Sequence, residues 1–267
     1  MLSIKEDDEI DLNNGTVWDE FSAAQLYREQ TLAYVRYTLG IETGACLLIT
    51  NRIILNFASI GAALKAAYTL EQNERVHEEM RFFTDMSERE QQLWLPGAIP
   101  SVNDFWRYCL GSSAVTVCLA LVEFGCEDMH LPAAFYHDKH VKRLMRCTNT
   151  IISDMNNLPL IKKEIQRDAI NSLIPILYFH GRDIQMAVHE VVVFIEKEIK
   201  ALDEAAESLE KRFEETKLRS QVREFVDECN HYTWGNLTWG LEMARHAVER
   251  VDGEIVMTLQ TASDRTS

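Results

Sequence analysis

The residues best suited to chemistry gather around Asn156. Asn156, Leu160 and Glu164 are spaced i, i+4 and i+8 along the chain, so on a helix they share one face. An amide oxygen and a carboxylate two turns apart are hard ligands that suit Mg²⁺. The same spacing is also common on solvated helix faces, so the metal-site interpretation needs support from other parts of the chain.

A second stretch combines aromatic rings, glycines and a cation. Trp234 and Trp239 are each followed by a glycine, and Arg245 comes shortly after them. Large aromatic side chains are usually core residues, which is the plainer interpretation. An indole face can also stabilise a carbocation by cation–π attraction, and an arginine can hold a phosphate.

A third stretch predicts a broken helix. Ser101 is a suitable N-cap for a helix through Trp106 and Tyr108, and the small residues 111–114 should weaken or break that helix before it resumes. A break in the core exposes carbonyl groups and a helix N-terminus at one spot. A simple packing kink would give the same sequence pattern.

Taken in order, these stretches resemble the class I terpene cyclases of the microbial sesquiterpene synthase type. The metal-binding triad of that family reads Asn-Asp-x-x-Ser-x-x-x-Glu, often with Lys before the Glu. Asn156 and Lys163-Glu164 match this pattern. Asn157 stands in place of the Asp, and Leu160 stands in place of the ligating Ser.

The two other stretches also resemble the family. Its last long helix carries a sequence like Gly-Asn-Leu-x-Trp-Ser-x-Glu-x-x-Arg-Tyr, and the stretch from Gly235 to Arg245 matches it except that Gly240 replaces Ser, while His246 replaces the Tyr that follows. In the segment after Pro100, Cys109 falls on the Arg that senses diphosphate in the family, so Arg107 is the candidate substitute. The resemblance covers about residues 74–250, and the first helices of the family have no counterpart in it.

The family's aspartate-rich motif is the part that matches least. Asp19-Glu20 lies 137 residues before Asn156, close to the expected place, but Ala23 stands where a third acid is expected. The string from Asp7 to Asp11 fits the letters Asp-Asp-x-x-Asp, yet it lies in a charged tail, where charge runs are usually solvated.

The resemblance implies ionisation of a prenyl diphosphate, with farnesyl diphosphate as the default substrate, and cyclisation of the allylic cation to a sesquiterpenoid. Mg²⁺ would be the cofactor. The implied site residues are Asn156, Glu164, Asp19 and Glu20 for the metal ions, Lys163, Arg245 and Arg107 for the diphosphate, and Trp239 and Phe105 for the cation.

Three alternatives stay open at this point. The changed contact positions (Asn157, Leu160, Cys109 and His246) also suit a catalytically inactive family member kept as a binding or scaffold protein. An altered enzyme could instead join a terpenyl cation to a second substrate. A helical bundle of unrelated function is the third alternative.

Composition narrows the class of protein. The formal net charge of −15 over 267 residues disfavours nucleic acid and anionic lipid as partners. Six scattered cysteines without a zinc spacing predict reduced core residues, and the N-terminus has no apolar signal core. The longest uncharged apolar run, residues 108–122, is shorter than a bilayer span. We therefore expect a cytoplasmic protein without membrane insertion, as a monomer or a homodimer.

Helical periodicity dominates the elements that must position these residues. The prediction is an all-α fold, a class I terpenoid-synthase-like helical bundle around a central cavity, formed by one domain over 19–251 between an acidic tail, 1–18, and a C-terminal tail, 252–267. The expected helices are 19–40, a central 45–70, 74–93, 101–121 with its break, 138–165 interrupted at Pro159, 172–180, 183–213 and 219–251.

Overall fold

The computed structural model describes residues 21–44, 48–95, 97, 99–126, 129–167, 172–242, 249–251 and 254–256, with side chains for all of these except 157, 159, 160, 162–167, 249–251 and 254–256. Contacts divide the chain into two compact units. The first unit is Met1–Ala98 with Gly111–Ala134, and the second is Ile99–Leu110 with Phe135–Ser267. The one domain expected over 19–251 stays a prediction, and each unit is described by itself.

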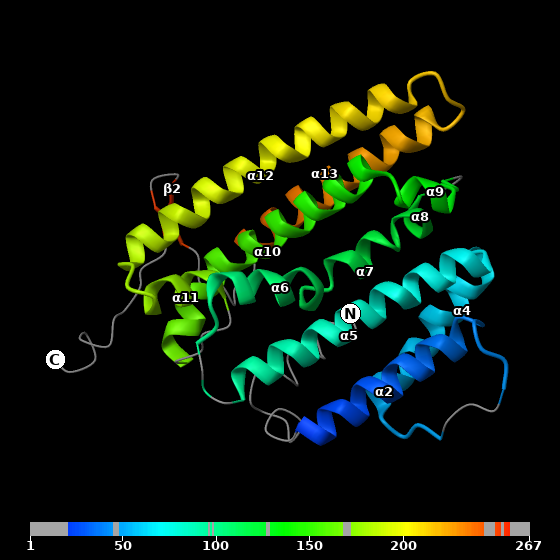
Figure 1. Ribbon diagram of the computed structural model, residues 1–267, viewed down its shortest axis with the longest axis horizontal. Coiled ribbons are helices and arrows are strands. Elements are labelled where there is room, and N and C mark those ends of the chain that lie inside the picture. The colour runs from blue at the N-terminus through cyan, green and yellow to red at the C-terminus, as the bar shows by residue number, and fades with distance from the viewer. Residues whose placement is uncertain are drawn as a thin grey trace. The chain divides into compact units, whose positions relative to one another are not determined.

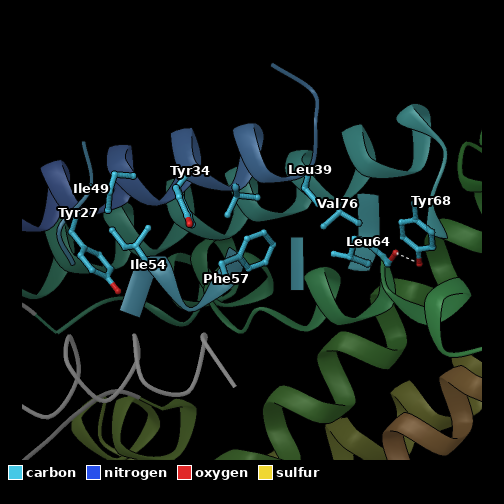
Figure 2. Packing of buried hydrophobic residues seen from close by; sticks show 11 residues of the cluster. Tyr27, Tyr34, Leu39, Ile49, Ile54, Phe57, Leu64, Tyr68 and Val76 are labelled. Atoms are coloured by element: carbon cyan, nitrogen blue, oxygen red, sulfur yellow. Dashed lines mark hydrogen bonds between the residues drawn. The ribbon is translucent and has the colours of Figure 1, made fainter. Parts of the chain in front are cut away.

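The first unit is built on two long helices. α2 (Phe21–Thr38) lies along α5 (Leu70–Trp94), and the shorter helices are α3 (Arg52–Leu55), α4 (Phe57–Ala67), α7 (Val115–Leu119) and α8 (Val122–Gly125) (Figure 1). A reciprocal capping box starts α5: the Gln72 N–H donates to Thr69 Oγ1, and the Thr69 N–H donates to Gln72 Oε1. Figure 2 shows the apolar cluster in which side chains of α2 meet those of α3, α4 and α5.

The predicted central helix over 45–70 is wrong in two respects. Within the described part of that range the chain forms two helices, α3 and α4, which meet at Asn56, and Asn51 caps α3 by accepting the Ile53 N–H at 2.8 Å. α4 buries only Phe57, Gly61 and Leu64. The outer side of α4 is exposed, although its residues are mostly alanine. The apolar sequence of this segment correctly predicts helix, but it does not predict that the segment lies at the surface of the unit.

A buried carboxylate in the first unit links α8 to α5 and to the segment after α8. Glu123 of α8 pairs with Arg75 of α5, and its Oε1 accepts the backbone N–H of Leu131 at 2.7 Å. Tyr68 lies beside this pair and donates its hydroxyl to the carbonyl of Ala120 at 3.3 Å. Burial, and then the charge of Glu123, raise the pKa of Tyr68 to about 12, so the phenol stays protonated.

The second unit surrounds one central helix. α10 (Lys139–Arg167) contacts α11 (Leu173–Phe179), α12 (Ile184–Phe213) and α13 (Arg219–Glu242), and in Figure 1 α12 and α13 run alongside it. Every residue of α10 from 147 to 155 is buried, so this helix forms the core of the unit. Asp183 caps α12 by accepting the Met186 N–H at 2.9 Å, so the expected helix 183–213 is present with Asp183 as its N-cap. α9 (Ala133–Tyr136) precedes α10 in the chain.

The predicted helix break is confirmed. α6 (Val102–Ser112) starts at Ser101, whose Oγ accepts the Asp104 N–H at 3.1 Å. Ala114 adopts φ 58°, the left-handed region, and α7 begins just after it. Gly111 is needed here because a Cβ at this position would collide with the side chain of Met86 on α5.

Two expectations about the second unit are wrong. α10 continues through Pro159 without interruption. Proline removes only one hydrogen bond from a 29-residue helix, and the packing against α12 and α13 outweighs that loss. The helix expected to reach residue 251 gives way to a hairpin, since β1 (Glu249–Val251) pairs antiparallel with β2 (Glu254–Val256). The Asp252-Gly253 dipeptide between the strands is a hairpin signal that the helical interpretation overlooked.

One stretch in the described residues, Val102–Gly125, has the length and the mean hydropathy, 1.5, of a membrane-spanning segment. It consists of three helices, α6, α7 and α8, and the left-handed Ala114 separates the first two. Lipid requires backbone groups to be paired within a continuous helix. The break therefore favours a core segment over a membrane span.

Candidate active site

The predicted metal-binding stretch lies on the second half of α10. Asn156 is half-buried, one residue after the fully buried part of the helix. Leu160 and Glu164 follow one and two turns later along the same helix, and Lys163 precedes Glu164. The continuous helix through Pro159 keeps the i, i+4, i+8 spacing, so the backbone holds these three positions on one face.

A hydrogen bond joins this stretch to the tryptophan-containing stretch of α13. Asn236 Nδ2 donates to Asn156 Oδ1 at 3.1 Å, across 80 residues of sequence. Trp239 lies three residues after Asn236 on α13, hence on the same face. Two of the three stretches singled out from sequence are therefore in contact.

The aromatic candidates have different surroundings. The core interpretation of the tryptophans is wrong, because Trp234 is 56% and Trp239 is 38% exposed. Trp239 thus has accessible ring surface that a ligand could contact. Phe105 on α6 is buried, with its ring edge-on to those of Trp106 and Tyr108 at centroid distances of 5.1 and 5.6 Å.

The candidates for diphosphate binding on α6 differ from the family pattern. Cys109, at the position of the sensing Arg, is buried. Arg107 has a 64% exposed side chain and pairs with Asp104 at 3.3 Å. A buried thiol cannot supply the positive charge, and the exposed guanidinium of Arg107 is free to move because surface ion pairs are weak. Its role in holding a diphosphate stays a prediction.

Several candidates lie outside the described residues, namely Asp19, Glu20, Arg245, His246 and the acids of residues 7–11. Their roles also stay predictions. Among the side chains that the structure does describe, no group of three or more His, Cys, Asp or Glu residues is arranged to hold a metal ion.

The donor chemistry around Asn156 fits a hard divalent cation, with one ligand fewer than in the family. The Asn156 amide supplies an oxygen that already faces a polar neighbour, Asn236. Glu164 supplies a carboxylate at the third position, whereas Leu160 has no oxygen to offer. Mg²⁺ keeps several waters in its coordination shell, so a water can occupy the missing position.

The described cysteines have no features of catalytic residues. Burial, together with Glu198, raises the pKa of Cys147 to about 11, and burial raises that of Cys229 to about 12. Both are thus neutral thiols, as expected of core residues. The prediction of core positions fails for Cys118, which is exposed, and for Cys126, which is partly exposed. None of the five described cysteines forms a disulfide.

Sequence reasoning missed a polar cluster inside α10. Thr148, Asn149, Ser153 and Asp154 are all buried, directly before Asn156. The signal was present, since two groups of consecutive polar residues, 148–150 and 153–154, flank Ile151 and Ile152 in the centre of a helix that must be buried. Asn149 makes the contact that matters most, because its Nδ2 donates to the carbonyl of Leu110 on α6 at 2.6 Å.

Comparison with known proteins gives the family to which this chain belongs. Residues 7–201 match the family described as terpene synthase family 2, C-terminal metal binding. The chain is 28% identical over 274 residues to the sesquiterpene cyclase hepA of Aspergillus oryzae, a match that spans 96% of this chain and 73% of that protein.

Solved structures of low sequence identity share the fold. Germacradien-4-ol synthase from Streptomyces citricolor superposes with a TM-score of 0.75 at 15% identity, over 91% of this chain and 75% of that one. Linalool/nerolidol synthase from Streptomyces clavuligerus, in complex with 2-fluorogeranyl diphosphate, gives 0.71 at 15% identity, over 83% and 77%. The all-α terpenoid-synthase fold expected from sequence is confirmed.

The family match and the fold are those of a class I terpene cyclase, a carbon–oxygen lyase. This chain belongs to terpene synthase family 2.

Proposed function

We propose that this protein ionises farnesyl diphosphate in the presence of Mg²⁺ and cyclises the resulting cation to a sesquiterpenoid. The observation that carries the proposal is the hydrogen bond between Asn156 and Asn236, which unites the metal stretch with the Gly-Asn-Leu-x-Trp stretch in a member of this family. The choice of a 15-carbon substrate is supported by the similarity to hepA, which is named a sesquiterpene cyclase.

Each proposed site residue has a chemical role. Asn156 and Glu164 on α10, with Asp19 and Glu20, would hold the metal ions. Mg²⁺ neutralises the charge that develops on a leaving diphosphate. Positively charged side chains, which matter in a chain of net charge −15, would come from Lys163, Arg245 and Arg107.

The hydrocarbon part of the substrate needs a different environment. The aromatic faces of Trp239 and Phe105 would stabilise the allylic cation by cation–π attraction, which strengthens when water is excluded. Loss of a proton or capture of water then ends the reaction. The acidic surface disfavours nucleic acid as a partner, and we propose that the enzyme works in the cytoplasm without inserting into a membrane.

The direct test is turnover. Purified protein incubated with Mg²⁺ and prenyl diphosphates of 10, 15 and 20 carbons should release a cyclic 15-carbon product from the 15-carbon substrate, detected by gas chromatography with mass spectrometry. Addition of a chelator should abolish the product. Formation of cyclic product from another chain length alone would correct the substrate, and product formation in the chelator would contradict the metal dependence.

One alternative has specific support. Leu160 has no ligating oxygen, and Cys109 is buried at the position of the sensing Arg. Both changes suit an inactive family member that binds a prenyl diphosphate or another protein without turnover. Binding of a prenyl diphosphate by calorimetry, with no product in the assay above, would support this alternative.

The substitution Leu160→Ser should restore a ligand to the metal site. If the enzyme is active, the half-maximal Mg²⁺ concentration should fall by roughly tenfold, since a single ligand or its support typically changes metal affinity by that factor or more. The measurement is the initial rate as a function of Mg²⁺ concentration.

Leu158→Ser is the matched control for this experiment. It makes the same chemical change on the same helix, two residues from Asn156 and off the face of the triad. It should leave the half-maximal Mg²⁺ concentration unchanged. Equal effects of the two serine substitutions, or an unfolded Leu160→Ser protein, would show that position 160 serves packing and not the metal.

A further inference from the structure

The break after α6 releases the carbonyl of Leu110 from its ordinary partner. In a continuous helix the Ala114 N–H would donate to this carbonyl, four residues back. Here the Ala114 N–H donates to the carbonyl of Gly111 at 3.1 Å instead. The side chain of Asn149 replaces the lost donor, with its Nδ2 at 2.6 Å from the Leu110 oxygen.

Asn149 is held in the orientation that this contact requires. It is 1% exposed on α10, and its Oδ1 accepts the hydroxyl of Ser153, one turn later, at 3.2 Å. With its oxygen occupied in this way, the amide presents its N–H₂ group to Leu110. Asn156 lies two turns beyond Asn149, on the same face of α10.

The contact joins two helices that carry proposed site residues. α6 carries Phe105 and Arg107, whereas α10 carries Asn156, Lys163 and Glu164. Two features of this region lower the stability of the fold and would not be needed for packing alone. A polar side chain is buried in the centre of α10, and Ala114 adopts a left-handed conformation that costs an L-residue roughly 1–2 kcal/mol. Such costs concentrate where geometry serves function.

We propose that Asn149, oriented by Ser153, is a positioning residue that caps the broken end of α6 and so fixes it against the helix of the metal stretch. The proposal rests on the proposed function above. Reacting groups misplaced by as little as 1 Å can cost about a hundredfold in rate. A contact that sets the spacing of the two helices should therefore act on the chemical step more than on binding.

The test is the variant Asn149→Leu, which keeps the size of the side chain and removes the donor. We expect kcat to fall by about tenfold or more, with KM for the prenyl diphosphate and the half-maximal Mg²⁺ concentration within about twofold of wild type. Thr148→Val is the matched control, because Thr148 is equally buried on α10 but its hydroxyl bonds the Leu144 carbonyl of its own helix at 3.0 Å and the thiol of Cys229 on α13, not the carbonyl of Leu110. It should keep kcat.

A second variant and a second measurement keep the proposal testable if Asn149→Leu does not fold. Ser153→Ala removes only the hydroxyl that orients the amide, and it should lower kcat by about twofold to threefold with KM unchanged. Hydrogen exchange of the backbone amides of residues 110–118 should accelerate by about tenfold in Asn149→Leu but not in Thr148→Val, because the capped carbonyl anchors the break.

The possible results of these experiments distinguish failure of the positioning role, of the cap and of the proposed function. A kcat within twofold of wild type in folded Asn149→Leu and in Ser153→Ala, or an equal loss in Thr148→Val, overturns the positioning role. Unchanged exchange over residues 110–118 overturns the cap. Absence of turnover by the wild type with every prenyl diphosphate overturns the proposed function and, with it, the positioning role of Asn149 in catalysis. Hydrogen exchange of residues 110–118 still tests whether Asn149 caps the Leu110 carbonyl.

Discussion

Replacing Glu164 with glutamine is expected to lower kcat/KM by about 10²–10³, the largest effect on activity that the site predicts. The amide keeps the size of the carboxylate but removes the negative charge that holds a divalent cation. Metal ions contribute several kcal/mol of charge stabilisation to the departing diphosphate, and each 1.4 kcal/mol corresponds to about a tenfold change in rate. Steady-state kinetics at saturating Mg²⁺ measures the effect.

The control for Glu164→Gln is the same substitution at Glu196. Glu196 is exposed on α12, and the nearest proposed site residue in the sequence, Glu164, lies on another helix. Glu196→Gln should keep kcat/KM within about twofold, as surface substitutions usually do. Activity of Glu164→Gln close to that of wild type would remove Glu164 from the metal site and with it the match to the family triad.

The largest effect on stability is expected at Glu123. Glu123→Ala should lower the free energy of unfolding by about 3–5 kcal/mol, because it leaves Arg75 without its carboxylate and the Leu131 N–H without its acceptor in the interior. Urea unfolding followed by circular dichroism measures the loss. The side chain of Glu123 is 1% exposed and that of Arg75 is 15% exposed, so water replaces neither contact.

An exposed ion pair offers the matched control. Arg143 and Glu204 are 3.1 Å apart with side chains 53% and 70% exposed. Glu204→Ala should cost no more than about 1 kcal/mol, because water screens such pairs. Equal losses for Glu123→Ala and Glu204→Ala would mean that the buried pair adds nothing beyond a surface contact.

Local signals in the sequence predicted most of the helices and one of their caps. Ser101 starts α6 as expected, and the small residues after Leu110 mark the break. These features depend on residues within one or two turns of each other, which is the range over which propensity and capping act. The stretches around Asn156 and Trp239 were also found this way.

Contacts between distant parts of the chain could not be predicted in this way. Asn149 caps a carbonyl 39 residues away, and Glu123 pairs with an arginine 48 residues away. Helical periodicity states which face of a helix is apolar, but it does not state which other helix covers that face. The same limit explains why the core interpretation of the tryptophans failed, and why α4 was expected at the centre.

The boundary between the two units falls inside α6, between Leu110 and Gly111. This position affects the order in which the two units can fold during synthesis. Residues 99–110 belong to the second unit, but they emerge before residues 111–134, which complete the first. At a synthesis rate of roughly 5–20 residues per second, the carbonyl of Leu110 waits on the order of a few seconds for Asn149, which follows it by 39 residues. During that interval this carbonyl lacks its native side-chain donor. Residues 99–110 therefore spend the early part of synthesis away from the unit to which they belong, and a chaperone that holds them there would protect the later contact with α10.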